Sequence, residues 1–310
     1  MSAAAGAAGG AADGAADGAA NGGAAGGGGR GPILDLAAMA DGVVRDAEGV
    51  WRTGAADPVR YPEDHDLCAA LEDASYWFRH RTRVIVELLR SLGAPPGAFV
   101  DVGGGNGVIS AAVAAAGRTV VLVEPGAAGI ANARRRGVPN LVLGLLQDAR
   151  FHEGAFAAAG LFDVVEHVPE ARALLEETRR VLMPGGLCII TVPALPWLWS
   201  AEDERAGHVR RYRLRELAAL AESAGLRVEM ASGLFRALVW PVFLARRLPW
   251  LLGIRRAPTA ERYGREHGTS RPGLLTRLIT SSLDREAAAL AAGRRFREGS
   301  SIILAARRPA

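Results

Sequence analysis

Short apolar runs alternate with helical stretches along the middle of the chain, and this alternation is the feature that most constrains its fold. Apolar strands separated by helices need crossover connections, which give a parallel sheet covered by helices on both faces. We therefore predict an α/β fold: a Rossmann-like, doubly wound, mostly parallel sheet of seven strands. The strands are expected at 98–102, 119–123, 140–144, 156–162, 187–192, 227–230 and 301–305.

The chain of 310 residues divides into four predicted segments. Residues 1–31 hold 12 Gly and 13 Ala, bury too little apolar surface to offset their ordering entropy, and are expected to be disordered. Residues 32–95 are expected to be a mostly helical attachment, because apolar residues such as Val84 and Leu88 recur at helical spacing. Residues 96–232 form the predicted core, and 233–310 supply cover helices and the last strand of the same domain.

Charge is unevenly distributed along the chain. All 37 basic side chains are Arg, and the segment from Leu234 to the end has 15 Arg against five acids, a net +10, while the rest carries −6. A basic segment favours contact with phosphates, an anionic membrane surface or an acidic ligand, although an arginine-rich solvated surface explains it equally well. No lysine-rich face or aromatic strand platform indicates a nucleic-acid partner.

Cysteine content and hydropathy favour a cytoplasmic protein. Cys68 and Cys188 lie far apart, so they predict no disulfide framework and no zinc site, and we expect no metal ligands. No apolar signal region follows a basic start. The apolar stretch 234–254 is interrupted by arginines, and its longest uncharged piece covers roughly 13 Å as a helix, too little for a bilayer of about 30 Å. It either covers a substrate pocket or lies in a membrane interface.

A glycine-rich turn follows the first core strand in the segment FVDVGGGNGVIS, residues 99–110. Asp101 lies on the strand, and Gly103, Gly105 and Gly107 would let the backbone approach a ligand closely beneath the amides of the next helix. A dinucleotide fingerprint G-x-G-x-x-G would need its third glycine at Val108, so pyrophosphate binding is disfavoured.

An acidic residue at the end of the second core strand indicates a nucleoside ligand. Glu124 closes the run VLVE at the same sheet edge as the glycine turn, where its carboxylate can accept hydrogen bonds from both ribose hydroxyls. This feature is shared with NAD enzymes, so it identifies the ligand class and not the chemistry.

From about Tyr76 to Ala305 the sequence resembles the class I S-adenosylmethionine-dependent methyltransferases, of the small-molecule branch. VDVGGGNG resembles the first motif of that family, QDA the segment after the third strand, GLFDVVEHV the fourth-strand motif, and VLMPGG the turn before the fifth strand. The resemblance implies S-adenosylmethionine as cofactor. Ala157 departs from the pattern, since an acid often follows the residue that corresponds to Phe156.

The resemblance also implies which residues bind the cofactor. Asp148 would face the adenine amine, and Asp163 would lie beside the methionine part of the cofactor. Trp77 and Arg81 would contact its aminoacyl end from a helical lid. The alternatives are that Asp148 is an ordinary turn residue and that the aromatic residues around Trp77 belong to the apolar core. The expected cofactor-binding residues are Asp101, Gly103, Gly105, Gly107, Glu124, Asp148, Asp163, Trp77 and Arg81.

The acceptor side is expected in the polar loop 193–212, because loops at one edge of a parallel sheet converge over the ligand. This loop resembles a W-S-x-x-D then G-H-x-R-R-Y pattern found in a subgroup of small-molecule methyltransferases. His208 is the leading general-base candidate, with Asp203 or Glu204 orienting it, and a structural role in the loop is the alternative. His167 is a second catalytic candidate, although Glu166 and His167 could instead brace the following helix.

These observations predict a methyltransferase that transfers a methyl group to an oxygen or nitrogen of a small-molecule acceptor, of lipid-linked or glycosidic type. Two rival classes stay open: a catalytically silent adenosyl-binding or membrane-peripheral protein, and a nicotinamide oxidoreductase. The expected partners are the small acceptor and, at the basic segment, an anionic membrane surface.

Overall fold

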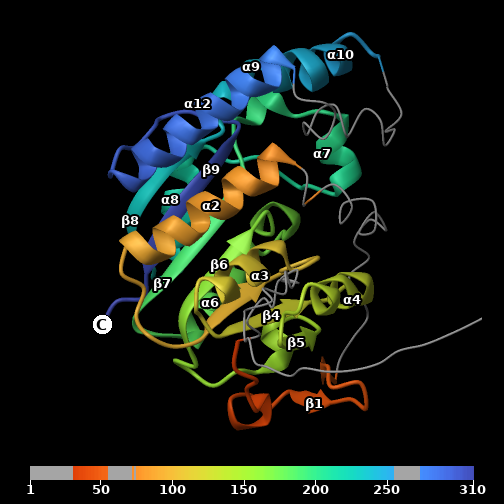
Figure 1. Cartoon of the computed structure of the whole chain (residues 1–310), viewed down its shortest axis with the longest axis vertical. Coiled ribbons are helices and arrows are strands. Elements are labelled where there is room, and N and C mark those ends of the chain that lie inside the picture. The colour runs from red at the N-terminus through yellow and green to blue at the C-terminus, as the bar shows by residue number, and fades with distance from the viewer. Residues whose placement is uncertain (1–30, 55–71, 73–74, 255–272) are drawn as a thin grey trace, which may run out of the picture.

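A computed structural model describes residues 31–54, 72, 75–254 and 273–310. Its centre is a nine-stranded sheet in the order β1-β2-β5-β4-β3-β6-β7-β9-β8, with helices on both faces (Figure 1). The expected disorder of 1–30 and the expected thiol of Cys68 lie outside the described residues. The strands are β1 (Val43–Arg45), β2 (Trp51–Thr53), β3 (Phe99–Val102), β4 (Val120–Glu124), β5 (Asn140–Leu143), β6 (Phe156–Phe162), β7 (Leu182–Pro193), β8 (Arg227–Leu234) and β9 (Ser301–Arg307).

The seven predicted core strands are all present, and the doubly wound α/β fold is confirmed. Strands β5, β4, β3, β6 and β7 run parallel, and β9 is inserted antiparallel between β7 and β8. Every residue of β3, β4 and β6 is buried, as expected for strands covered on both faces. The carboxyl ends of the parallel strands therefore meet at a single edge of the sheet.

The expectation of a mostly helical segment 32–95 was wrong for its first part, and the count of seven strands was therefore two too low. Besides the short 3-10 helix η1 (Leu36–Ala38), residues 43–53 form the antiparallel hairpin β1-β2, and β2 pairs in parallel with β5. Asp46 accepts hydrogen bonds from the amides of Glu48 and Val50, and Gly49 has φ of +83°, so the turn is held by local chemistry.

Helices cover the sheet in two layers because alternate strand residues face opposite ways. Val100 and Val102 pack in one apolar cluster with α6 and α8, and Phe99 packs in the other with α2, α3 and α12. The helices are α2 (Tyr76–Ser91), α3 (Val108–Ala115), α4 (Ala127–Arg135), α5 (Leu146–Ala149), α6 (Ala171–Val181), α7 (Ala201–Ala206), α8 (Leu214–Ser223) and α12 (Leu274–Ala291).

The segment VLMPGG, expected to be the turn before the fifth core strand, largely belongs to that strand. Helix α6 stops at Val181, and β7 begins at Leu182 and runs through Gly185 and Gly186. On the same strand Cys188 is a free, fully buried thiol, and burial raises its pKa to about 12.

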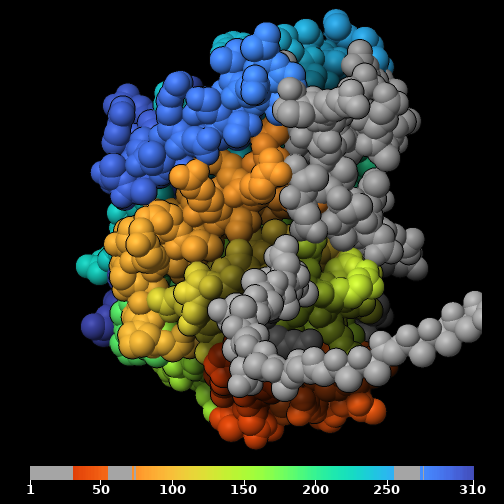
Figure 2. Space-filling view, viewed as in Figure 1, coloured from red at the N-terminus to blue at the C-terminus, as the bar shows by residue number. Residues whose placement is uncertain are grey.

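The predicted cover segment packs at the end of the molecule opposite the β1-β2 hairpin (Figures 1 and 2). It consists of η4 (Arg236–Leu238), α9 (Val239–Val242), the π-helical turn η5 (Phe243–Arg247) and α10 (Leu248–Leu251). Within the described residues, no helix combines the length and apolarity required to cross a membrane. The cover contacts the polar loop, since Arg247 Nη1 donates to the Trp199 carbonyl oxygen at 2.8 Å.

Candidate active site

The glycine turn joins β3 to α3 with three left-handed residues. Gly103, Gly105 and Gly107 have φ of +68°, +52° and +78°. A Cβ at Gly103 would lie 2.7 Å from a Val164 methyl group, and one at Gly107 would lie 2.9 Å from the Ala133 backbone. A Cβ at Gly105 would have no atom within 4 Å. Gly103 and Gly107 therefore allow close packing, whereas Gly105 faces open space in which a ligand can lie.

Asp101 is a buried carboxylate just before this turn. Its Oδ2 accepts a hydrogen bond from Ser110 Oγ at 2.7 Å, but its buried Oδ1 has no partner among the described residues. Burial raises the pKa of Asp101 to about 6, despite the opposing hydrogen bond from Ser110. The site thus has an acceptor atom suited to a cationic ligand group.

Glu124, at the end of β4, contacts the glycine turn directly. Its Oε2 accepts from the Gly105 amide at 2.9 Å and its Oε1 from the Gly126 amide at 2.7 Å. Each carboxylate oxygen has two lone pairs. The side chain lies beside the open space at Gly105, at the sheet edge where a nucleoside ligand is expected.

Asp148 lies in the first turn of the short helix α5, at the same edge of the sheet, and is partly exposed. The N-terminal hairpin segment packs on this helix, because the Gly42 amide donates to the Ala149 carbonyl oxygen at 3.1 Å. A Cβ at Gly42 would come within 2.1 Å of the Asp148 carbonyl oxygen. The hairpin therefore supports the segment expected to face adenine.

Arg81, Asp163 and Trp77 lie together where α2 crosses the end of β6. The buried Arg81 forms an ion pair with the partly exposed Asp163, and its guanidinium lies 4.3 Å from the Trp77 ring centroid. Asp163 has φ of +57° and also accepts from Thr191 Oγ1 at 3.1 Å. On its other side Trp77 stacks on Phe235 at 5.1 Å. Three expected cofactor residues are thus brought together, and Trp77 also has the packing role considered as the alternative.

A polar brace behind the glycine turn was missed by the sequence analysis. Asn106 Nδ2 donates to Glu72 Oε1 at 3.0 Å, Arg136 Nη2 donates to Glu72 Oε2 at 3.0 Å, and Asn132 Nδ2 donates to Asn106 Oδ1 at 2.8 Å. Asn106, between Gly105 and Gly107, could have indicated these contacts, since a buried side-chain amide needs hydrogen-bond partners.

The polar loop 193–212 forms one hydrogen-bonded network around Asp203. This carboxylate accepts from the Ser200 amide at 2.9 Å, from Arg211 Nε at 2.7 Å, and is 2.9 Å from His208 Nδ1. Burial raises the pKa of Asp203, but bonds from His208 and Arg211 outweigh it and lower the pKa to about 2. Asp203 is therefore ionised at neutral pH, and of the two acids expected to orient His208 it lies within hydrogen-bond distance of that ring.

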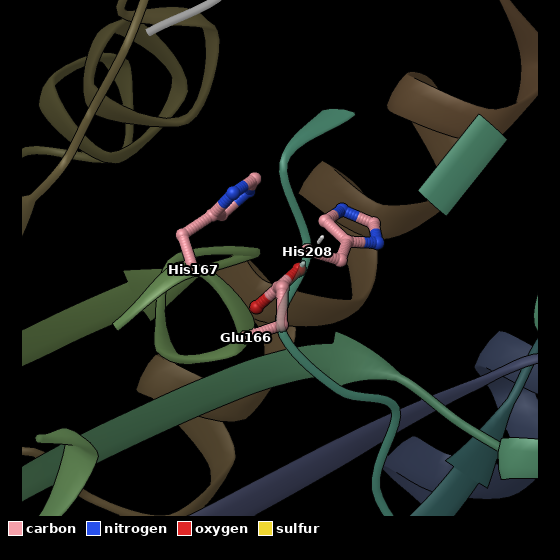
Figure 3. A group of neighbouring side chains, drawn as sticks. All are labelled: Glu166, His167 and His208. Carbon is pink, nitrogen blue, oxygen red and sulfur yellow. Dashed lines mark ion pairs between the residues drawn. The ribbon is translucent and has the colours of Figure 1, made fainter. Parts of the chain in front are cut away.

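Glu166 and His167 follow β6 in the 3-10 turn η2 (Val165–His167), and they face His208 (Figure 3). The His167 and His208 rings are 4.8 Å apart, and His208 Nε2 lies 4.0 Å from Glu166 Oε1. Burial, together with the charge of His208, lowers the pKa of His167 to about 4. Burial and the charge of Asp163 hold the pKa of Glu166 well above its usual range.

The Glu166 carboxylate does not brace the following helix, which corrects that alternative. It is fully buried, and neither of its oxygens accepts a hydrogen bond from another described residue. The Glu166 backbone carbonyl accepts from the Val209 amide at 2.8 Å, and the contact of its carboxylate at ion-pair distance is with His208 Nε2.

The strand order defines the class of protein by its fold, a Rossmann-like α/β protein. Comparison with known proteins narrows the class. The sequence model of a methyltransferase domain family, Methyltransf_23, matches residues 77–231, half of the chain. The chain therefore belongs to the class I S-adenosylmethionine-dependent methyltransferase family, whose cofactor is S-adenosylmethionine.

Individual relatives agree with this assignment. A protein of Mycolicibacterium smegmatis named as a probable S-adenosylmethionine-dependent methyltransferase is 28% identical over 169 residues, 53% of this chain and 65% of that protein. The ubiquinone biosynthesis O-methyltransferase of Psychrobacter arcticus is 32% identical over 100 residues, 30% of this chain and 39% of that enzyme. The chain thus spans less than two thirds of the length of either relative.

A solved structure shows the same fold. It is a chain in the complex between the Haloferax volcanii Trm112 methyltransferase activator and a methyltransferase, with a TM-score of 0.52 at 16% identity. The similarity covers 81% of this chain and 98% of that one.

Proposed function

We propose that the protein is an S-adenosylmethionine-dependent methyltransferase that acts on an oxygen or nitrogen of a small-molecule acceptor. The observation that carries the proposal is the open space at the Cβ position of Gly105, whose amide donates to the Glu124 carboxylate, together with the Oδ1 of Asp101 on β3, which has no partner among the described residues. These groups fit a nucleoside that carries an amino acid, because they offer acceptors for a cationic amino group and for sugar hydroxyls.

Calorimetric titration tests the proposal. S-Adenosylmethionine and its demethylated product should each bind at one site, and NADH should not, because the third glycine of the dinucleotide fingerprint is absent. Binding of NADH alone would favour the oxidoreductase. Binding of the adenosyl ligands without turnover on any tested acceptor would favour a silent binding protein.

Nine residues form the proposed cofactor side. Gly103, Gly105 and Gly107 shape the turn, Asp101 holds the amino group, Glu124 the ribose and Asp148 the adenine amine. Asp163, Arg81 and Trp77 border the aminoacyl end from β6 and α2, where the Arg81–Asp163 pair fixes the helix to the sheet.

Cofactor affinity should fall as the pH drops below about 6. With a pKa near 6, Asp101 is mostly protonated at pH 5, and a protonated carboxyl attracts a cationic amino group less. We expect affinity about tenfold weaker at pH 5 than at pH 7.5, measured by calorimetry. The Asp101→Asn variant should bind S-adenosylmethionine weakly at both pH values. If its affinity instead depends on pH as that of the wild type does, the group that titrates is not Asp101.

Methyl transfer needs alignment, exclusion of water and removal of the acceptor proton. S-Adenosylmethionine, when bound, would supply an electrophilic methyl group on a positively charged sulfur; an acceptor lone pair would take this methyl group, and the sulfur would keep the electrons of the broken bond. His208, held through Nδ1 by Asp203, presents Nε2 to take the acceptor proton. His167, neutral at pH 7, borders the same position.

The acceptor is proposed to be apolar in part, of lipid-linked or glycosidic type. The cover segment and the polar loop present Trp197, Trp240 and Leu244 at the surface, with the last two 67% and 59% exposed. Trp197 and Trp240 both contact Phe243, so the exposed rings form one apolar surface. Arginines of the same segment suit it to an anionic membrane, and we propose a cytoplasmic protein with peripheral membrane contact.

Flotation with liposomes tests this surface. The full chain should float with vesicles containing anionic lipid at low salt, and a Trp240→Ser/Leu244→Ser variant should float several-fold less because apolar area is lost. Val44→Ser, which removes an exposed apolar side chain from the distant hairpin, serves as the matched control. Absence of the wild-type protein from the vesicle fraction would remove the lipid-linked version of the proposal.

A further inference from the structure

We propose that Glu166, His167 and His208 form a binding site for one divalent transition-metal ion. Each side chain offers one ligand atom, and the three atoms lie within 4.8 Å of one another. Figure 3 shows the three side chains converging from the turn after β6 and from the polar loop. Metal bonds to imidazole nitrogen and carboxylate oxygen are about 2.0–2.2 Å, so binding would draw these atoms together by on the order of 1 Å.

The strongest support is the carboxylate of Glu166. It is fully buried and accepts no hydrogen bond from another described residue. A buried carboxyl group without a partner is costly, and a bound cation would supply the missing partner. Within the described part of the chain, no arginine lies within ion-pair distance of it, and its one such contact is His208 Nε2 at 4.0 Å.

The orientation of His208 is that of a metal ligand. Its Nδ1 is held by Asp203 at 2.9 Å, and Asp203 is itself fixed by Arg211 and by the Ser200 amide. This arrangement leaves Nε2 facing Glu166. Metal-binding histidines commonly donate their second ring N–H to a carboxylate, which fixes the tautomer and the ring direction.

The donor set indicates the class of metal. Two imidazole nitrogens and one carboxylate oxygen suit Zn²⁺ and similar transition-metal ions, whereas Ca²⁺ and Mg²⁺ prefer sites built from oxygen. Three protein ligands leave at least one coordination position open, as in catalytic zinc sites.

The role of the ion depends on the proposed methyltransferase function. An acceptor hydroxyl bound at the open position would release its proton to solvent water more easily, since a bound cation favours the oxyanion. In the metal-bound protein, His208 Nε2 donates its lone pair to the ion. His208 then acts as a ligand, and the general-base role belongs to the metal-free form.

Metal binding is tested on the full chain after chelation and dialysis, with Zn²⁺ titrated calorimetrically and the bound metal counted by elemental analysis. We expect one Zn²⁺ per chain. Glu166→Gln and His167→Gln should each weaken the affinity by about tenfold or more. The matched controls Glu202→Gln, in the same loop network, and His152→Gln, on the surface, should bind Zn²⁺ like the wild type.

A Co²⁺-loaded sample gives a readout that needs no variant. Coordination of Co²⁺ by two histidine nitrogens should produce absorption in the visible range, and this absorption should disappear when Zn²⁺ replaces the Co²⁺. Absent absorption, or Zn²⁺ affinity unchanged in Glu166→Gln, would overturn the site. Titration of the same samples with S-adenosylmethionine separates the two proposals. If the protein binds the cofactor but no metal, the metal site is wrong and the proposed function stands. If it binds the metal but not the cofactor, the proposed function is wrong and the metal site stands.

Discussion

Replacing Gly105 with aspartate should abolish binding of S-adenosylmethionine while the protein stays folded. A side chain at this position would enter open space, so it meets no neighbouring atom. It would instead occupy the proposed place of the ligand and add a carboxylate near Glu124, which accepts from the Gly105 amide. We expect affinity to fall by about two orders of magnitude or more, roughly 3 kcal/mol, in calorimetric titration.

Gly117→Asp is the matched control for this experiment. Gly117 also has a positive φ, +89°, and open space around its Cβ position, but it lies after the last turn of α3, away from the glycine turn. Both variants carry a similar backbone penalty of about 1 kcal/mol. Thermal melting should therefore shift alike in the two, and wild-type affinity in Gly105→Asp would remove the cofactor from this turn.

Replacing His208 with alanine should lower turnover by about 10²- to 10⁴-fold on an identified acceptor. Cofactor affinity should stay within a factor of two, because His208 contacts Asp203, Glu166 and His167 and not the glycine turn. The measurements are kcat and KM across pH together with calorimetric cofactor binding. His152→Ala, a surface histidine, is the control.

Two results would assign His208 differently. Near-normal turnover with unchanged cofactor affinity would exclude it from acceptor activation. A rise in KM with kcat unchanged would indicate that it binds the acceptor without acting on the proton.

The core sheet could be predicted from the sequence because its strands are buried on both faces. A run such as that of β6 has no polar residue, which suits a strand between two helical layers. The β1-β2 hairpin escaped prediction because its strands have three residues each, too few for a clear alternation, and its turn lacks an Asn-Gly or Asp-Gly pair. Its stability comes from packing of Trp51 and pairing with β5, which are tertiary effects.

The parts of the candidate site that lie at strand ends or within one loop could be predicted from the sequence. The parts that depend on contacts between separate loops were missed. Strand-end positions placed Asp101 and Glu124 at one edge, and the spacing within one loop related Asp203 to His208. The approach of Glu166 to His208 joins two loops that are separate in sequence. Nothing in the local pattern distinguishes an unpartnered buried glutamate from one that caps a helix, so this cluster required the structure.

Helix α2 connects the two halves of the site mechanically. Arg81 ties it to Asp163 at the sheet, while the buried pair of His80 Nε2 with Glu286 Oε2, at 2.9 Å, ties it to α12. Glu286 also accepts from the amides of Phe235 and Arg236 at the start of the cover segment. Displacing α2 from the sheet would therefore also disturb the start of the cover segment, so these two parts of the molecule cannot move independently.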